Sequence, residues 1–187
     1  MSGSIPPFTL DGLLPVGDYP VTLSDLRGSH LVTGSGVSPG TWDTDWRAVL
    51  VDNLTLLVGQ LWQAGIDRIF VDGSFVEDKD HPNDIDGYFE CDLRYLARGD
   101  LQRDLNSLDP HKVWVWDRTS RRPDPNSAKM QLPMWHQYRV ELYPHTPLFP
   151  QGSGIRDQWG NDQPFPSAFR RSRREDRPKG IVQIVRA

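Results

Sequence analysis

The sequence has very little cysteine: Cys91 is the only one in 187 residues. A single thiol excludes an internal disulfide framework and any zinc site built from several cysteines. The sequence also lacks an apolar run of the roughly eighteen residues that a membrane span needs. Its first residues show neither the basic nor the apolar stretch of a signal peptide. These absences predict a soluble, cytoplasmic protein with no membrane partner.

Positive charge is scarce except near the end of the chain. The net charge is −4, yet residues 170–187 hold seven Lys and Arg against two acids. The remaining residues are therefore strongly acidic. An acidic body with a basic tail fits an enzyme that handles metal ions and phosphates, and it equally fits an ordinary solvated terminus.

The length and patterning predict one domain over residues 1–187. Residues 1–42 are rich in Gly, Pro and Ser and are expected to form a loop-rich N-terminal arm, and residues 168–187 a basic C-terminal tail. Helical spacing predicts a helix from Asp43 or Thr44 to Gly65 and another over 93–108. Strands are expected at 66–71, 85–91, 112–116, 136–143 and, as an edge strand, 181–185. This order predicts an α+β fold, a small mixed β-sheet with helices packed mainly on one face.

Asp84 and Asp86 are separated by one residue at the start of a predicted strand. Positions i and i+2 of a strand point to the same face, so the two carboxylates are expected to project together. Two like charges held that close favour a cation between them, and oxygen ligands suit Mg²⁺ or Mn²⁺. Alone, such a pair is a weak signal, because it also occurs on solvated surfaces.

Gly73 and Ser74 close the preceding predicted strand, ten residues or so before the acidic pair. Small residues at such a turn let the backbone approach phosphate oxygens closely. A turn that holds phosphate beside carboxylates that hold Mg²⁺ is suited to nucleotidyl transfer.

Two-metal transfer usually needs a third carboxylate. The first candidate is Glu141, because its neighbours Val140 and Leu142 are expected to face the core and leave Glu141 on the opposite face. The second candidate is Asp117, which follows the predicted strand 112–116 and opens a loop.

Residues 73–86, with Gly73-Ser74 followed by Asp84-Ile85-Asp86, resemble the signature of the DNA polymerase β-like nucleotidyltransferase superfamily. More narrowly, the chain is similar to a group of small, poorly characterised bacterial proteins of that superfamily. The features shared with them are Asp11-Gly12-Leu13-Leu14-Pro15 near the start and Arg177-Pro178-Lys179-Gly180-Ile181-Val182 near the end.

The resemblance implies that the chain is a metal-dependent nucleotidyltransferase, moving a nucleoside monophosphate from an NTP onto an RNA (for example tRNA) or protein acceptor. In that reading Gly73 and Ser74 hold the triphosphate, and Asp84, Asp86 and Glu141 bind the metal. Many members have Asp at the third position, so the longer Glu141 departs from the pattern. Small stand-alone members include toxins of toxin–antitoxin pairs, so an antitoxin protein is an expected partner.

Lys79 and Lys179 are further candidates, each able to neutralise charge on the triphosphate or on the leaving pyrophosphate. Each is also consistent with an ordinary lysine, solvated in a loop or placed by a strand. Five arginines of the tail, which either form a cradle for RNA or triphosphate or are simply solvated, are Arg170, Arg171, Arg173, Arg174 and Arg177.

Two other functions remain open from the sequence. One is a non-catalytic module that binds a nucleotide or a protein partner on the same fold. The other is metal-dependent hydrolysis of a phosphodiester or phosphoanhydride, which the acidic pair alone permits. The turn at Gly73 is better explained by a triphosphate substrate.

Overall fold

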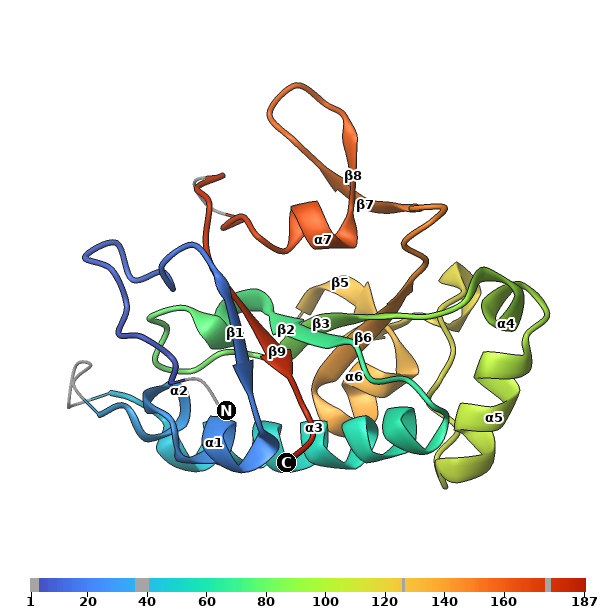
Figure 1. The fold of residues 1–187 in the computed structure, drawn as a ribbon, viewed down its shortest axis with the longest axis horizontal. Helices are drawn as coiled ribbons and strands as arrows, with labels where there is room; N and C mark the ends of the chain where they lie inside the picture. Colours follow the sequence, from blue (N-terminus) through green and yellow to red (C-terminus); the bar gives the residue numbers. More distant parts are fainter. Residues whose placement is uncertain (1–3, 36–40, 126, 174–175) are drawn as a thin grey trace.

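A five-stranded mixed β-sheet lies at the centre of the computed structural model, which describes residues 4–35, 41–125, 127–173 and 176–187 (Figure 1). The strand order is β1-β9-β2-β3-β6. Pairing is parallel between β1 and β9 and between β3 and β6, and antiparallel on both sides of β2. The strands are β1 (Asp18–Val21), β2 (Ile69–Asp72), β3 (Ile85–Glu90), β6 (Val140–His145) and β9 (Ile181–Ile184).

Most helices cover one face of this sheet, which confirms the predicted α+β architecture (Figure 1). They are α1 (Leu23–Gly28), α2 (His30–Thr33), α3 (Thr44–Gln63), α4 (Leu93–Ala97), α5 (Asp100–Leu108) and α6 (Pro133–Tyr138). The opposite face carries α7 (Phe165–Ala168) and the hairpin of β7 (Gly152–Arg156) and β8 (Asp162–Pro164). A second hairpin consists of β4 (Arg122–Asp124) and β5 (Ser127–Gln131).

The longest helix, α3, begins and ends where the sequence predicts. The Asp43 carboxylate accepts a hydrogen bond from the Trp46 backbone N–H at 3.0 Å, which satisfies a donor that the helix itself cannot. Gly65, in the left-handed region with φ +79°, follows the C-terminus. Leu50, Leu54, Leu57 and Leu61 recur at helical spacing and are fully buried against the sheet.

The predicted helix over 93–108 is two helices, because Gly99 adopts a left-handed conformation (φ +74°) between α4 and α5. The predicted strand over 112–116 is wrong. There the Asn106 side chain binds both backbone groups of Trp114, accepting from its N–H at 3.0 Å and donating to its C=O at 2.9 Å. The Asn106 side chain thus satisfies the backbone groups of Trp114 that a neighbouring strand would bind in a sheet.

The predicted strand over 136–143 is partly wrong at its start. Pro133 suits the first turn of a helix, and α6 continues to Tyr138. Arg139 then takes a left-handed conformation (φ +53°) that ends the helix, and β6 begins at Val140.

Both chain ends are more ordered than the sequence indicates. Residues 1–42 include β1, α1 and α2, and their side chains Leu14, Val21, Leu26 and Leu31 are buried in the main core. Residues 168–187 include β9, which lies between β1 and β2 rather than at the edge. In the described part of the chain no helix combines the length and apolarity needed to cross a membrane.

Candidate metal and nucleotide site

Three carboxylates stand in one row across neighbouring strands. Asp72 of β2 is paired in register with Asp86 of β3, and Asp86 is paired in register with Glu141 of β6. Residues directly opposite each other on paired strands share a face, so this row lies on one side of the sheet. Asp84, two residues before Asp86, lines the same cavity as Asp86 and Glu141. The predicted projection of Asp84, Asp86 and Glu141 toward one space is therefore observed.

Glu141 is held at both carboxylate oxygens. Its neighbours Val140 and Leu142 are fully buried in the core, and Glu141 itself points to the other face. Oε1 accepts a hydrogen bond from the Leu132 backbone N–H at 3.0 Å, and Oε2 accepts one from the Tyr143 hydroxyl. These contacts fix the orientation of the Glu141 side chain.

Asp117, the other candidate for the third carboxylate, lies outside this site. It caps η2 (Arg118–Ser120), and its Oδ1 accepts from the Thr119 and Ser120 backbone N–H groups at 3.0 Å each. Its side chain is exposed and does not line the cavity. Glu141 is therefore the third carboxylate that the fold brings to the acidic pair.

The cavity that Asp84, Asp86 and Glu141 line has a volume of about 190 Å³. Its carboxylates face three cationic side chains, those of Arg121, Lys129 and Arg173. One wall is apolar, with Tyr143 stacked on Phe165 at 4.8 Å between ring centroids. The lining residues come from β3, β6, the β4–β5 hairpin, the β7–β8 region and the C-terminal segment, and they are Asp84, Asp86, Arg121, Lys129, Gln131, Glu141, Tyr143, Ser153, Ile155, Phe165, Phe169 and Arg173.

Burial and mutual repulsion make this row attractive to cations. Burial and, to a smaller extent, the charge of Asp86 together raise the pKa of Asp84 to about 7, although a 2.7 Å hydrogen bond from Trp135 Nε1 opposes the shift. Burial likewise raises the pKa of Glu141, and it raises the pKa of Asp72 to about 7. A nearby positive charge favours the ionised form of each of these groups.

Arg173 brings a positive charge to the carboxylates, since its guanidinium lies 3.6 Å from Asp86 Oδ2. The Arg173 side chain is 55% exposed, whereas that of Asp86 is 11% exposed. This contact places a positive charge from the C-terminal segment at the acidic end of the cavity. Among the described arginines of the tail, Arg173 is thus the one that lines the cavity.

The donors at the site fit Mg²⁺ or Mn²⁺ in their chemistry, because the cavity is lined by carboxylates and contains neither His nor Cys. Asp84, Asp86 and Glu141 are the residues that would hold the ion. Within the described residues, no three or more His, Cys, Asp or Glu side chains are already gathered as a metal-ligand group. In this structure Trp135 donates a hydrogen bond to the Asp84 carboxylate, and Tyr143 donates one to the Glu141 carboxylate.

The turn at Gly73 and Ser74 lies directly beside Asp86. It is the start of η1 (Gly73–Val76), which follows β2 without a gap. Gly73 has φ +76°, and a Cβ placed there would lie 2.7 Å from Asp86 Oδ2. Glycine is therefore required both for the backbone conformation and for the close approach of the carboxylate.

Lys179 lies beneath this turn rather than in the cavity. Its side chain is 2% exposed, and its Nζ is 3.1 Å from Asp72 Oδ1 and 2.5 Å from Glu77 Oε1. The same Nζ donates a hydrogen bond to the Gly73 C=O at 3.1 Å. Two carboxylates and a carbonyl oxygen thus surround the ammonium group, so Lys179 holds the turn in place instead of lining the cavity.

Lys79 is not brought to the cavity. Its C=O accepts a hydrogen bond from the buried Arg47 guanidinium, which also binds the C=O groups of Phe75 and Leu31. Arg47 packs over the Trp42 ring at 3.8 Å. The loop after the Gly73 turn is therefore fastened to α3 by a second buried cation.

The two terminal motifs meet at this same turn. The Asp78 N–H donates to the Gly12 C=O at 2.7 Å, and Leu13 forms a β-bridge with Glu77. The Gly180 N–H donates to the Leu14 C=O at 3.0 Å, which joins the second motif to the first. The segments 11–15 and 177–182 thus form the support of the turn.

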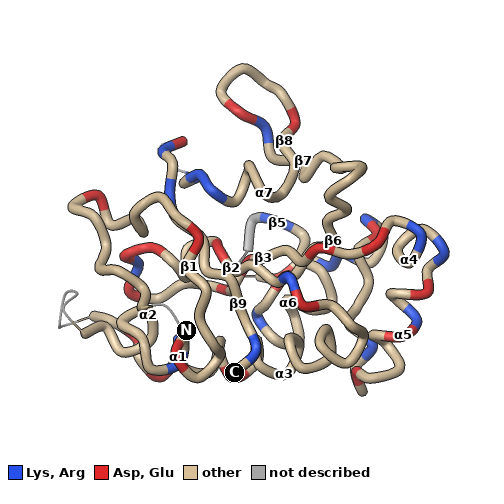
Figure 2. The backbone as a smooth tube through the Cα atoms, in the orientation of Figure 1, with Lys and Arg blue, Asp and Glu red and all other residues tan. Residues whose placement is uncertain are grey.

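The other tail arginines are paired within the chain rather than forming an open cradle. Arg170 binds Asp18 at 2.8 Å, Arg171 binds Asp176 at 2.5 Å, and Arg177 binds Asp11 at 2.8 Å. Arg174 lies outside the described residues. Figure 2 shows these basic positions on the C-terminal segment beside α7.

Sequence reasoning missed Arg121, Lys129 and Tyr143. Tyr143 follows Glu141 by two positions in a predicted strand, so alternation alone places it on the active face. Arg121 and Lys129 come from the β4–β5 region, where no periodic pattern marks a direction. Arg121 donates from Nη2 to the Tyr143 hydroxyl at 3.1 Å.

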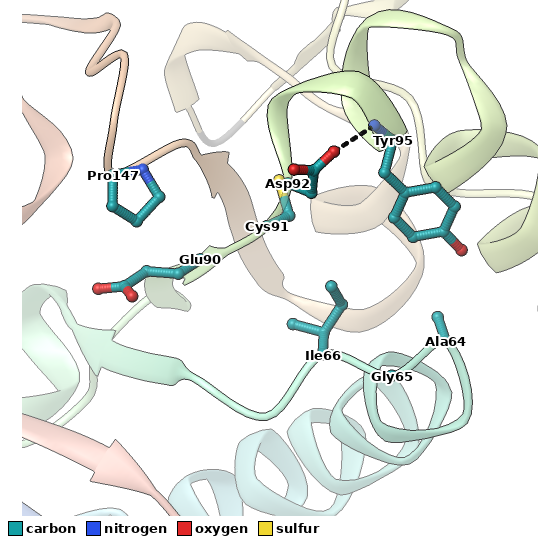
Figure 3. A pocket seen from close by; sticks show the side chains of 8 residues that line it. All are labelled: Ala64, Gly65, Ile66, Glu90, Cys91, Asp92, Tyr95 and Pro147. Atoms are coloured by element: carbon teal, nitrogen blue, oxygen red, sulfur yellow. Dashed lines mark hydrogen bonds between the residues drawn. The ribbon is translucent and has the colours of Figure 1, made fainter.

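A second cavity, of about 330 Å³, lies at the other end of β3 (Figure 3). Burial raises the pKa of the Cys91 thiol to about 11, so this sulfur is a poor nucleophile. Asp92 is engaged as the cap of α4, accepting from the Tyr95 backbone N–H at 3.1 Å. The lining, which assembles no catalytic group, is Ala64, Gly65, Ile66, Glu90, Cys91, Asp92, Tyr95 and Pro147.

Comparison with known proteins identifies the family of this chain but does not indicate an activity. Residues 6–185 match the model of a family described as "Family of unknown function (DUF6932)". No curated protein and no solved structure matches the chain. The match spans nearly all of the sequence, and the chain therefore belongs to the DUF6932 family.

Proposed function

We propose that this protein is a metal-dependent nucleotidyltransferase that moves a nucleoside monophosphate from an NTP onto an RNA or protein hydroxyl. The observation that carries the proposal is that Asp84, Asp86 and Glu141 line one cavity, with Asp86 and Glu141 in register on neighbouring strands and the Gly73 turn beside Asp86. The same cavity is lined by Arg121, Lys129 and Arg173, as a polyphosphate substrate requires.

The proposed reaction is a displacement at the α-phosphorus. An acceptor oxygen forms a bond to that phosphorus, the bond to the β-phosphate oxygen breaks, and pyrophosphate leaves. A divalent ion at Asp84, Asp86 and Glu141 would stabilise the charge on the phosphate oxygens. Glu141, with a pKa raised by burial, is suited to take the proton of the acceptor hydroxyl.

The Gly73 turn and Arg173 are the groups proposed to contact the triphosphate. Gly73 places the backbone of the turn beside Asp86, where the triphosphate of the substrate would lie. Arg173, now 3.6 Å from Asp86, is suited to move onto the phosphates when a metal ion neutralises the carboxylates.

The test is transfer of label from each α-³²P-labelled NTP to total cellular RNA and protein in the presence of Mg²⁺ or Mn²⁺. We expect Asp84→Asn and Asp86→Asn to abolish labelling while the circular dichroism spectrum stays unchanged. Asp52→Asn, an exposed position on α3, is the matched control and should transfer at the wild-type rate. Undiminished transfer by the Asp84 and Asp86 variants would show that the proposed site is wrong.

A toxin role, with an antitoxin partner, is part of the same proposal and is tested separately. Induced expression of the wild-type chain should arrest growth, and the Asp86→Asn variant should not. Equal growth with both would remove the toxin role and leave the transferase proposal to the labelling assay.

A further inference from the structure

Two of the three cavity carboxylates, those of Asp84 and Glu141, each accept a hydrogen bond from an aromatic side chain. Trp135 Nε1 donates to Asp84 Oδ2 at 2.7 Å, and the Tyr143 hydroxyl donates to Glu141 Oε2. Each carboxylate oxygen has about two lone-pair directions, so one donor leaves room for a further ligand on the same group. The two aromatic donors therefore hold these carboxylates without occupying them fully.

An arginine directs the Tyr143 hydroxyl toward Glu141. Arg121 Nη2 donates to the hydroxyl oxygen at 3.1 Å, and Arg121 Nη1 donates to the Met130 C=O at 3.1 Å. A tyrosine hydroxyl has a single proton, and a guanidinium has no lone pair that could accept it. The proton must therefore point away from Arg121, to Glu141. Stacking on Phe165, with ring centroids 4.8 Å apart, also holds the Tyr143 ring in place.

A second arginine holds Trp135 beside Asp84. The Arg139 guanidinium carbon lies 3.7 Å from the centroid of the Trp135 ring. Arg139 has φ +53°, a conformation that glycine or asparagine usually takes at the end of a helix. Its C=O accepts a hydrogen bond from the N–H of Ile85, the residue after Asp84, at 3.0 Å. Arg139 thus fixes both the backbone next to Asp84 and the indole that binds its carboxylate.

These contacts limit how the two carboxylates can turn. Trp135 is 2% exposed, so turning Asp84 away would leave a buried N–H without its acceptor, which is costly. The other oxygen of Glu141 accepts from the Leu132 N–H at 3.0 Å, so this carboxylate is held from two directions. Groups that orient metal ligands typically change metal affinity or activity by roughly 10- to 100-fold.

We propose that Trp135 and Tyr143 are positioning residues of the candidate metal site, each supported by an arginine. Through the carboxylates of Asp84 and Glu141 they set the geometry that a divalent ion would meet, and neither contacts the ion itself. This inference rests on the metal site of the proposed function and deepens it. It does not depend on the transfer reaction, so metal binding alone decides it.

Calorimetry with Mn²⁺ and no nucleotide compares the full wild-type chain with Trp135→Phe and Tyr143→Phe, which lose the donor but keep an aromatic ring. We expect each variant to bind Mn²⁺ about tenfold more weakly. Tyr138→Phe is the matched control, because the Tyr138 hydroxyl donates to Asp109 at 2.8 Å and does not line the cavity. It should leave Mn²⁺ affinity unchanged.

Three results of this comparison have distinct meanings. Equal Mn²⁺ affinity of the wild type and both variants would overturn the inference, as would a wild type that binds no Mn²⁺. The expected losses together with no labelling of any acceptor would support the inference and remove the transferase proposal.

The arginine behind Trp135 is tested by Arg139→Gln. We expect it to weaken Mn²⁺ binding about threefold in the wild type. It should have no effect in the Trp135→Phe background, where the N–H is already absent. Arg186→Gln is the matched control, because its guanidinium lies 5.4 Å from the Trp62 ring centroid and pairs with Asp67. An equal effect of Arg139→Gln in both backgrounds would overturn the supporting role of this arginine.

The indole N–H signals of a ¹H–¹⁵N spectrum give a readout that needs no activity. The signal that is lost in Trp135→Phe should shift when Mg²⁺ is added and also in Asp84→Asn, because both change its acceptor. The signal of Trp159, 77% exposed between β7 and β8, is the control and should stay in place. A Trp135 signal that moves in neither case would overturn the inference.

Discussion

Lys179 and Asp72 form a buried ion pair, with Nζ 3.1 Å from Oδ1, directly beneath the turn that starts at Gly73. The pair joins β2 to the segment before β9, and Glu77 shares the same ammonium at 2.5 Å. Its position makes the shape of the turn depend on a residue from the other end of the chain. Lys179 thus acts on the candidate site through the backbone that it holds.

We expect Lys179→Met to destabilise the protein by about 3 kcal/mol, because it leaves buried carboxylates without their cation. Urea unfolding measures the loss. The double variant Lys179→Met with Asp72→Asn should recover part of it, since the amide carries no charge. A loss below about 1 kcal/mol would contradict the buried pair as a support of the turn.

Gly73→Ala should be more damaging than Gly65→Ala, although both glycines have nearly the same φ, +76° and +79°. An added Cβ at Gly65 meets nothing within 4 Å, whereas at Gly73 it lies 2.7 Å from Asp86 Oδ2. Gly65→Ala therefore measures the left-handed strain alone, about 1 kcal/mol. The excess at Gly73 should appear both in urea unfolding and as weaker binding of Mg²⁺-NTP in calorimetry. Equal effects would show that the turn tolerates displacement of Asp86.

Arg173→Gln should tighten binding of Mg²⁺ alone by roughly threefold, because it removes a competing charge from a half-exposed ion pair worth about 0.6 kcal/mol. Calorimetry without nucleotide measures this change. Arg171→Gln, whose guanidinium pairs with Asp176, is the control and should leave Mg²⁺ affinity unchanged. Weaker Mg²⁺ binding by the Arg173 variant would rule out competition.

Stability in metal-free buffer should fall as the pH rises from about 4 to about 7. The pKa of Asp84 is raised by burial and by Asp86 from its ordinary 3.8 to about 7. Within that window the folded protein retains a proton that the unfolded chain has lost, so raising the pH disfavours folding, and above it the contribution is constant. Asp84→Asn should flatten the slope by up to about 1.4 kcal/mol per pH unit, and Asp52→Asn should not. Urea unfolding between about pH 5 and pH 8 measures the difference; identical slopes would contradict it.

Strong periodic segments could be predicted from the sequence, and segments governed by distant contacts could not. The helix α3 and strands β2 and β3 carry their own caps and patterns, and they place Gly73, Asp84 and Asp86 correctly. Glu141 followed from the alternation of Val140 and Leu142. The segment around Trp114 reads as a strand, yet its backbone is bound by Asn106, a contact that no local pattern reveals.

Distant contacts also explain why the positions of Lys179 and Arg121 could not be predicted from the sequence. A lysine in a Pro-Lys-Gly turn has the same local signature whether it faces phosphate or Asp72. Only the placement of β9 between β1 and β2 buries it. Arg121 reaches the cavity because the β4–β5 hairpin folds toward β6, which depends on tertiary packing rather than on spacing.

The contact between Lys179 and Gly73 spans 106 positions of the chain. Proteins are synthesised from the N-terminus, so Asp72, Asp84 and Asp86 emerge long before the lysine that supports the turn, and Glu141 also precedes it. Closing so long a loop is entropically costly and slow. The turn at Gly73 should therefore lack its support in the nascent chain until Lys179 has been made and β9 has paired with β2.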